Sequence, residues 1–252
     1  MTDFPEPIPA ATLVLMRPSA SGPPDLLVIE RAANMAFAAG ALAFPGGRID
    51  PDDHASAALH GAGLADAAAR VAAIRETIEE TGIAVGIRQQ PDPDQAASLR
   101  NGLAAGEAFS RLLDQHRLSL DLEALVPFAR WCPNFRETRR FDTHFYIAEA
   151  PAGAPLVSAD ETEAARAFWS SAAAVLMEIE AGEARAIFPT RRNLERLARF
   201  ASIDDARADA ALHPVQKITP WVEERDGRHW VCIPEEAGYP VTAELFETAR
   251  RR

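Results

Sequence analysis

Several residue types are scarce in this chain of 252 residues, and each scarcity excludes a class of protein. Only two cysteines occur, Cys132 and Cys232, which is too few for a disulfide framework and indicates a reducing compartment. No apolar run approaches the roughly 20 residues of a membrane-spanning helix, so we expect no membrane partner. The first residues lack the basic start and apolar stretch of a signal peptide. These features together predict a cytoplasmic protein.

Positive charge is scarce as well. Lysine and arginine number 26 against 37 aspartates and glutamates, which gives a net charge of -11. A surface that coats nucleic acid is normally basic, so we expect no nucleic acid duplex as a partner. The chain also has neither a Gly-x-Ser-x-Gly elbow nor a P-loop, which gives no support to a serine hydrolase or a P-loop nucleotidase. Its length suffices for one elaborated domain or a domain with an appendage.

The most informative stretch that is present runs from Arg75 to Ile83. On a helix, Glu76, Glu79 and Glu80 fall at positions i, i+3 and i+4, and these positions share one face. Three carboxylates on one face repel each other unless a cation lies among them. Mg²⁺ and Mn²⁺ prefer oxygen ligands, and Mg²⁺ commonly bridges to substrate phosphates. The spacing therefore predicts a metal site suited to hydrolysing a phosphate or diphosphate, and a solvated acidic face is the alternative.

Three neighbouring features favour the metal interpretation. Arg75 precedes the first glutamate and can pair with a carboxylate one turn away. Gly82 follows the acidic turn, at the point where a helix end needs a left-handed residue. Upstream, Phe44-Pro45-Gly46-Gly47 is a tight turn through which backbone can approach a ligand closely.

Phe44-Pro45-Gly46-Gly47 followed by Arg75-Glu76-x-x-Glu79-Glu80-x-Gly82-Ile83 resembles the Nudix box. The resemblance implies an α/β fold, namely an α/β/α sandwich with a mixed sheet and extra helices. It implies a hydrolase of nucleoside diphosphates linked to another moiety, with Mg²⁺ or Mn²⁺ as cofactor and a small-molecule diphosphate as substrate. Within it, Gly46, Gly47, Arg75 and Gly82 shape the box, while Glu76, Glu79 and Glu80 bind metal and serve catalysis. The resemblance leaves the oligomeric state open, with a homodimer as one candidate.

The chain departs from the family pattern, which runs Gly, five residues, Glu, seven residues, Arg. Gly47 and Arg75 are 28 positions apart, where the pattern has 14, and this predicts an inserted loop at 51–65. The glutamate expected eight residues before Arg75 falls on Ala67. Thr77 replaces an aliphatic residue. The candidates to replace the missing glutamate are Asp50, Asp52, Asp53 and Asp66.

A second set of residues resembles the coenzyme A-cleaving branch of the superfamily. It comprises Leu26-Leu27-x-x-x-Arg31 and Gly40-x-x-x-Phe44-Pro45-Gly46-Gly47-x-x-Asp50, together with the extended insert. The resemblance implies cleavage of the diphosphate bond of coenzyme A or an acyl-coenzyme A. A pyrophosphohydrolase of ADP-ribose, NADH or nucleotides is one alternative. A Nudix-fold binding module without catalysis is the other.

Further candidates follow from side-chain chemistry. Glu161 and Glu163 lie in a polar stretch before a predicted helix and are candidates for the general base, with a helix-capping acidic loop as the alternative. Arginine matches phosphate geometry with two donors, and the candidates for substrate binding are Arg31, Arg48, Arg136, Arg139 and Arg140. A solvated strand edge is the alternative for Arg136, Arg139 and Arg140, whereas Arg31 and Arg48 lie nearer the box in the sequence. Met35 and Phe37 could line a groove for an acyl chain, with core packing or a dimer contact as the alternative. We interpret His144 as structural.

Periodicity predicts the remaining elements. Strands are expected at 10–16, 26–31, 83–87, 122–132 and 141–148, and helices at 66–82, 104–116, 163–182 and 189–202. Within the first helix Val71, Ile74 and Ile78 should face inward. A hairpin is expected over 218–233 and a short helix from Thr242. We expect a domain over 8–200 and a C-terminal extension over 201–252 that packs on it.

Overall fold

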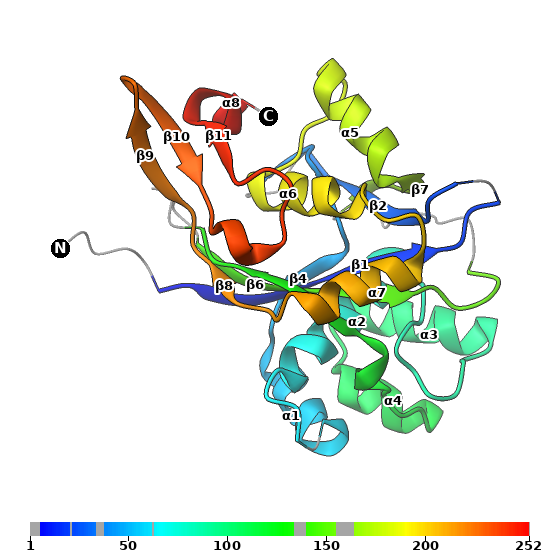
Figure 1. Ribbon diagram of the computed structural model, residues 1–252. Coiled ribbons are helices and arrows are strands. Elements are labelled where there is room, and N and C mark those ends of the chain that lie inside the picture. The colour runs from blue at the N-terminus through cyan, green and yellow to red at the C-terminus, as the bar shows by residue number, and fades with distance from the viewer. Residues whose placement is uncertain are drawn as a thin grey trace.

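A computed structural model describes residues 6–20, 22–33, 38–61, 63–133, 140–154 and 164–251 of the chain. Within these residues, eight strands form a mixed sheet that has helices on both faces (Figure 1). The predicted α/β sandwich is therefore confirmed. The strands are β1 (Ile8–Arg17), β2 (Asp25–Arg31), β3 (Leu42–Ala43), β4 (Gly46–Arg48), β5 (Val126–Trp131), β6 (Phe141–Glu149), β7 (Ala164–Ser171) and β8 (Lys217–Ile218).

The main path of the sheet runs β3-β2-β1-β6-β5-β8, with β4 also paired to β1 and β7 to β2. Strands β1 and β6 are parallel, as are β5 and β8, while the other pairs are antiparallel. The apolar run in β1 suits a central strand covered on both faces, and Leu13 to Leu15 are fully buried.

Two hydrophobic cores flank the sheet. One lies against α2 (Ala67–Thr81), α3 (Pro93–Ala104) and α4 (Phe109–His116). The other lies against α5 (Ala172–Ala181), α6 (Phe188–Leu197) and α7 (Ile203–Leu212). In Figure 1 the helices α2, α3 and α4 lie below the sheet, and α5 and α6 lie above it.

Helix α2 forms where the periodicity predicts it. Val71, Ile74 and Ile78 are 0% exposed and face the first core, as expected. Gly82 ends the helix in the left-handed region at φ 73°, and its N–H donates to the carbonyl of Ile78. Asp66 stands at the N-cap position, but its side chain bonds Arg70 and Tyr146 and does not cap the helix backbone.

The C-terminal part forms a second, three-stranded sheet of β9 (Trp221–Arg225), β10 (Arg228–Cys232) and β11 (Ala243–Leu245), followed by α8 (Phe246–Arg251). The predicted hairpin is confirmed, since Asp226 and Gly227 both adopt positive φ between β9 and β10. Tyr239 reaches into the second core, where its hydroxyl donates to Asn193 Oδ1 at 2.7 Å.

Four local predictions are wrong. Residues 51–60 are not an inserted loop but helix α1 (Pro51–His60), which starts with a proline and a capping box between Asp50 and Asp53. Residues 164–171 are strand β7 and not the start of a helix, because they pair along β2. Residues 83–87 form only an isolated bridge from Ile87 to Leu120.

The fourth error concerns helix limits between 89 and 212. Helix α4 begins at Phe109 and not at 104, because 93–104 is a separate helix, α3. Helix α6 ends at Leu197, and the next helix, α7, was not predicted. Both unpredicted helices follow a capping residue, Asp92 or Ser202, whose side chain accepts an N–H from the first turn.

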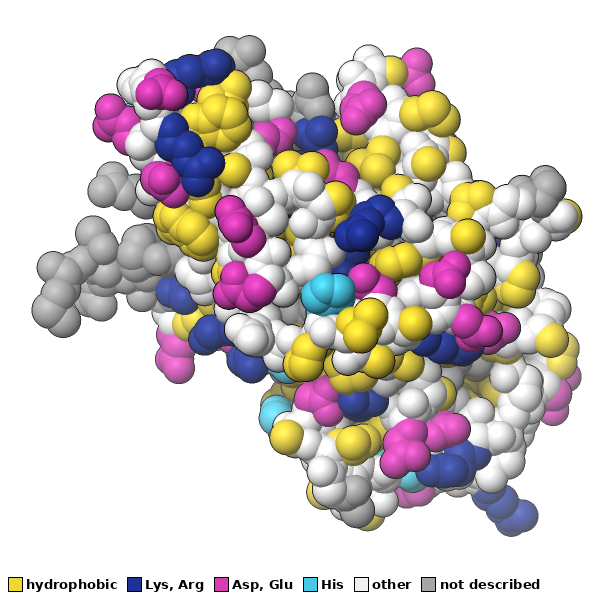
Figure 2. All heavy atoms as spheres, in the orientation of Figure 1, with side chains coloured by type: hydrophobic (Ala, Val, Ile, Leu, Met, Phe, Trp, Pro, Cys, Tyr) yellow, Lys and Arg dark blue, Asp and Glu magenta, His cyan; other side chains and the backbone are white. Residues whose placement is uncertain are grey.

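The surface seen in Figure 2 mixes acidic and basic side chains, so the net negative charge is not gathered into one field on this face. Among the described helices, none has both the length and the apolar composition to cross a membrane.

Candidate active site

Arg75 of α2 lies at the centre of a group of carboxylates. Its Nε and Nη2 donate to Oδ1 and Oδ2 of Asp53, both at 3.0 Å. Its Nη1 donates to Glu76 Oε1 at 2.9 Å and to Glu79 Oε2 at 3.4 Å. Burial opposes the charge, but the hydrogen bonds to Asp53 and the charge of Glu76 raise the pKa of Arg75, which therefore stays cationic. Arg75 thus holds Glu76 and Glu79 side by side.

Asp53 anchors Arg75 from the neighbouring helix. Its side chain is 0% exposed, and Oδ2 also accepts the N–H of Asp50 at 2.8 Å. It lies six positions after Gly47, where the family pattern has its first glutamate. Counting back from Arg75 leads instead to Ala67, which is a core residue at the start of α2. Counting forward from Gly47 would have found Asp53, and it places the insert after Asp53.

At Gly46 and Gly47 the backbone lies close to the carboxylates of α2. The N–H of Gly46 donates to Glu80 Oε2 at 3.0 Å. A side chain at Gly47 would collide with the carboxylate of Glu76, and one at Gly46 would collide with strand β1. The peptide at this turn can therefore lie directly beside α2 only because both residues lack a Cβ.

The three glutamates of α2 differ in exposure. The side chains of Glu76 and Glu79 are 12% and 30% exposed, whereas Glu80 is 2% exposed. Their oxygens are the donor type that Mg²⁺ and Mn²⁺ prefer, so the donor chemistry fits such an ion. Among the described residues, however, three or more metal-binding side chains do not gather around one point. Arg75 occupies the position between Glu76 and Glu79.

Of the four aspartates considered as substitutes, two join this group. Asp50 lies 3.8 Å from Arg75 Nη2 with a side chain that is 52% exposed, and Asp53 is the buried anchor. Asp52 instead accepts the N–H and hydroxyl of Ser110 at the start of α4. Asp66 accepts from Arg70 and Tyr146.

The structure describes three of the predicted substrate-binding arginines. Arg48 follows Gly47 directly, and its carbonyl accepts from Arg75 Nη2 at 2.9 Å, so it lies beside the carboxylates. Arg31 ends strand β2, and Arg140 precedes strand β6, with its carbonyl bonded to the N–H of Ile8. The remaining candidates lie outside the described residues, namely Met35, Phe37, Arg136, Arg139, Glu161 and Glu163.

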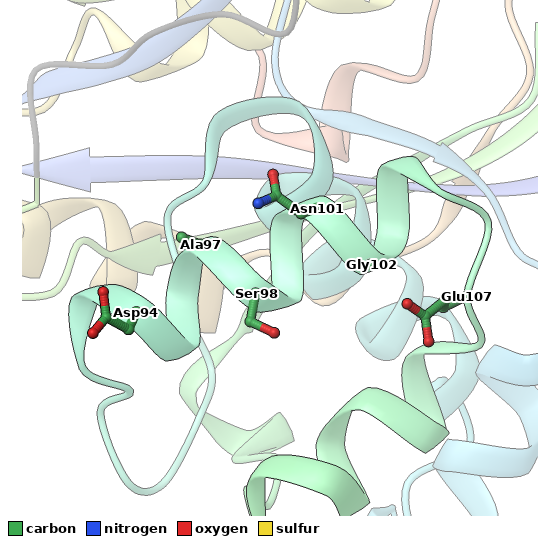
Figure 3. A pocket seen from close by; sticks show the side chains of 6 residues that line it. All are labelled: Asp94, Ala97, Ser98, Asn101, Gly102 and Glu107. Carbon is green, nitrogen blue, oxygen red and sulfur yellow. The ribbon is translucent and has the colours of Figure 1, made fainter.

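An open hollow of about 420 Å³ lies elsewhere, on α3 (Figure 3). Its lining consists of Asp94, Ala97, Ser98, Asn101, Gly102 and Glu107. None of these residues belongs to the group around Arg75, so we do not place the site there.

Comparison with known proteins gives two kinds of relative. No family model matches the chain. A solved structure of a Nudix hydrolase from Alicyclobacillus acidocaldarius is 31% identical, with a TM-score of 0.71 over 81% of this chain and 96% of that one. Acyl-coenzyme A diphosphatase NUDT19 of Gallus gallus is 27% identical over 81% of this chain and 70% of that protein. The Homo sapiens protein of the same name is 26% identical over 84% of this chain and 74% of its own length.

Proposed function

This chain belongs to the Nudix hydrolases, and we propose that it hydrolyses the diphosphate bond of coenzyme A or an acyl-coenzyme A. The observation that carries the proposal is the arrangement of Arg75, which holds Glu76 and Glu79 together beside the turn at Gly47. A carboxylate pair fixed beside closely approaching backbone suits the binding of a metal-bound diphosphate.

In this proposal Glu76, Glu79 and Glu80 would hold Mg²⁺ or Mn²⁺. When bound, such an ion makes water a better nucleophile and offsets the charge of the diphosphate. Arg75 orients the carboxylates, and Glu80 fixes the N–H of Gly46. Proton removal is assigned to Glu161 or Glu163, and phosphate contacts to Arg31, Arg48, Arg139 and Arg140. Of these arginines, Arg48 has a contact with the group around Arg75, which its backbone carbonyl makes.

The choice of coenzyme A rests on two kinds of sequence similarity. The branch resemblance includes residues 26–31, in β2, and the turn at Gly46 and Gly47, in β4, together with the extended insert. The two NUDT19 proteins are named as acyl-coenzyme A diphosphatases and align over most of this chain. The two buried free thiols, Cys132 and Cys232, support a cytoplasmic location. The partner is then a small-molecule diphosphate.

Product analysis tests the substrate. The purified protein is incubated with Mg²⁺ or Mn²⁺ and coenzyme A, an acyl-coenzyme A, ADP-ribose, NADH or nucleoside triphosphates. We expect coenzyme A to yield adenosine 3',5'-bisphosphate and phosphopantetheine. Turnover of ADP-ribose or NADH alone would overturn the coenzyme A assignment. No turnover of any of them would favour a binding module.

A further inference from the structure

A row of paired residues leads across the sheet from the glycine turn. Gly47 of β4 pairs with Ala11 of β1, which pairs with His144 of β6. His144 pairs with Arg130 of β5, which pairs with Lys217 of β8. Directly paired residues on neighbouring strands point to the same face of a sheet. The side chains of His144, Arg130 and Lys217 therefore lie on the face where Glu76 meets Gly47.

The spacing of strands fixes the length of this row. Neighbouring strands lie about 4.8 Å apart, so the backbone of His144 is roughly 10 Å from Gly47 and that of Arg130 roughly 14 Å. Ala11 is buried under the core on the α2 side, so a ligand that reaches both ends passes along the flank of α2. A nucleotide with further substituents has the reach to do this.

The first half of β6 is covered less completely than the second half. Phe145 to Ala148 are buried, whereas Phe141 to His144 are only half-buried. The part of β6 that lies under α2 ends at Tyr146, whose hydroxyl donates to Asp66 Oδ2 at the start of α2. The His144 ring stacks on Tyr146 at 6.2 Å between centroids, just beyond that cover. A polar strip of the sheet thus adjoins the site.

The strip carries fixed positive charge. Arg130 donates from Nε and Nη2 to the two oxygens of Asp142 at 2.8 and 2.9 Å, which holds its planar group in place. Lys217 Nζ lies 4.0 Å from Asp142 Oδ2. The charges of Arg130, Lys217 and Asp142 therefore sum to one positive charge. The chain as a whole has a net charge of -11. Burial and the charge of Arg130 lower the pKa of His144, so near pH 7 its neutral ring offers a hydrogen bond.

We infer that Arg130, His144 and Lys217 form a subsite for a phosphate monoester that the substrate carries apart from the cleaved diphosphate. The inference rests on the proposed function, because it adds a second contact for the same substrate. Coenzyme A bears such a group on its ribose, and 3'-dephospho-coenzyme A lacks it. The subsite makes the enzyme selective between these two molecules.

Paired substrates test the subsite. The double variant Arg130→Gln with Asp142→Asn removes both charges and keeps a hydrogen-bonded pair, and Lys217→Gln changes a side chain that is 48% exposed. We expect kcat/KM for coenzyme A to fall about tenfold in each, since a charge-assisted hydrogen bond is lost. For 3'-dephospho-coenzyme A, kcat/KM of the same variants should change less than about twofold. The matched control is Arg88→Gln, a surface arginine 3.8 Å from Asp121.

Two results would overturn the subsite. One is an equal loss for both substrates, and the other is no loss for either. If the wild-type protein cleaves neither substrate, the proposed function fails. Nucleotide binding then tests whether the subsite exists. Calorimetry should then show about tenfold tighter binding of adenosine 3',5'-bisphosphate than of adenosine 5'-monophosphate, lost in Lys217→Gln. Equal affinities for the two nucleotides would refute the subsite.

Discussion

At the scale of single residues, the site depends on Asp53, a carboxylate that binds an arginine inside the protein. Asp53 is fully buried, and each of its oxygens accepts from Arg75. The spacing from Gly47 would have identified its position, but its partner could not be predicted, because only the packing of α1 on α2 brings them together. The face shared by Glu76, Glu79 and Glu80 was predictable from helical spacing alone.

Asp53→Asn should destabilise the protein. The substitution leaves the buried guanidinium of Arg75 without its main counter-charge, and losing one partner of a buried pair costs about 3–5 kcal/mol. We expect the free energy of unfolding to fall by about 3 kcal/mol in urea titrations. Asp114→Asn, at an exposed position on α4, is the control. A loss below about 1 kcal/mol would show that Asp53 does not anchor Arg75.

Asp66 gives a prediction about pH. Burial opposes its charge, but Arg70 and the Tyr146 hydroxyl hold the pKa of Asp66 below its ordinary value. A lowered folded pKa contributes stability above the unfolded pKa of about 3.9, and this contribution is lost as pH falls through the folded pKa. Asp66→Asn should therefore be less stable than wild type at pH 7, with the difference shrinking below about pH 4. Urea unfolding at pH 7, 5 and 3 measures this difference in stability. A difference that stays constant with pH would contradict the lowered pKa of Asp66.

At the scale of elements, α1 connects the site to the outer helices. Asp52, one residue before Asp53, accepts the Ser110 N–H at 2.9 Å and its hydroxyl at 2.6 Å at the start of α4. One turn of α1 thus holds both Arg75 and α4. The first turn of α1 therefore braces the box.

Asp52→Ala should cost about 1 kcal/mol of stability, the usual effect of losing a helix cap. The expected loss includes the hydroxyl contact of Ser110 as well as the backbone bond. Chemical denaturation measures it, beside His54→Ala at an exposed position of the same helix. Equal stabilities of the two variants would mean that Asp52 does not tie α1 to α4.

The sequence predicted elements well where one periodicity dominated and poorly where tertiary pairing decided. Helix α2 and strands β1, β2 and β6 follow their apolar patterns. Residues 164–171 are rich in alanine, which favours a helix, yet they pair with β2 along its length. Helix α3 carried a readable start signal in Asp92-Pro93 and Gln95, and the two prolines around it indicated a loop instead.

At the scale of the whole molecule, the C-terminal part joins the core through charge as well as through apolar contacts. Arg191 and Arg192 of α6 both donate to Glu244 of β11, each at 3.1 Å. The side chain of Arg192 is 2% exposed, and it also donates to Glu195. Trp131 Nε1 donates to the Tyr239 hydroxyl at 2.9 Å. We propose on these contacts that residues 201–252 fold together with 8–200 as one unit.

Glu244→Gln tests this proposal. Among the described residues, the variant leaves two largely buried guanidiniums with Glu195 as their ion-pair partner, so we expect a loss of about 3 kcal/mol. One cooperative unfolding transition should persist with a lower midpoint, as for a single unit. Calorimetry measures both features, with Glu236→Gln at an exposed position of the same segment as control. A separate early transition would show that the C-terminal part unfolds independently.

A comparison of three proteins tests whether the glutamates held by Arg75 carry the hydrolysis. Coenzyme A hydrolysis is measured against Mg²⁺ concentration for wild type, Glu79→Gln and Glu180→Gln, the last at an exposed position on α5. We expect Glu79→Gln to lower kcat by about a hundredfold or more, the scale of losing a group that stabilises transition-state charge. Glu180→Gln should stay within about twofold of wild type. Full activity in Glu79→Gln would show that the carboxylate of Glu79 is not required for the hydrolysis.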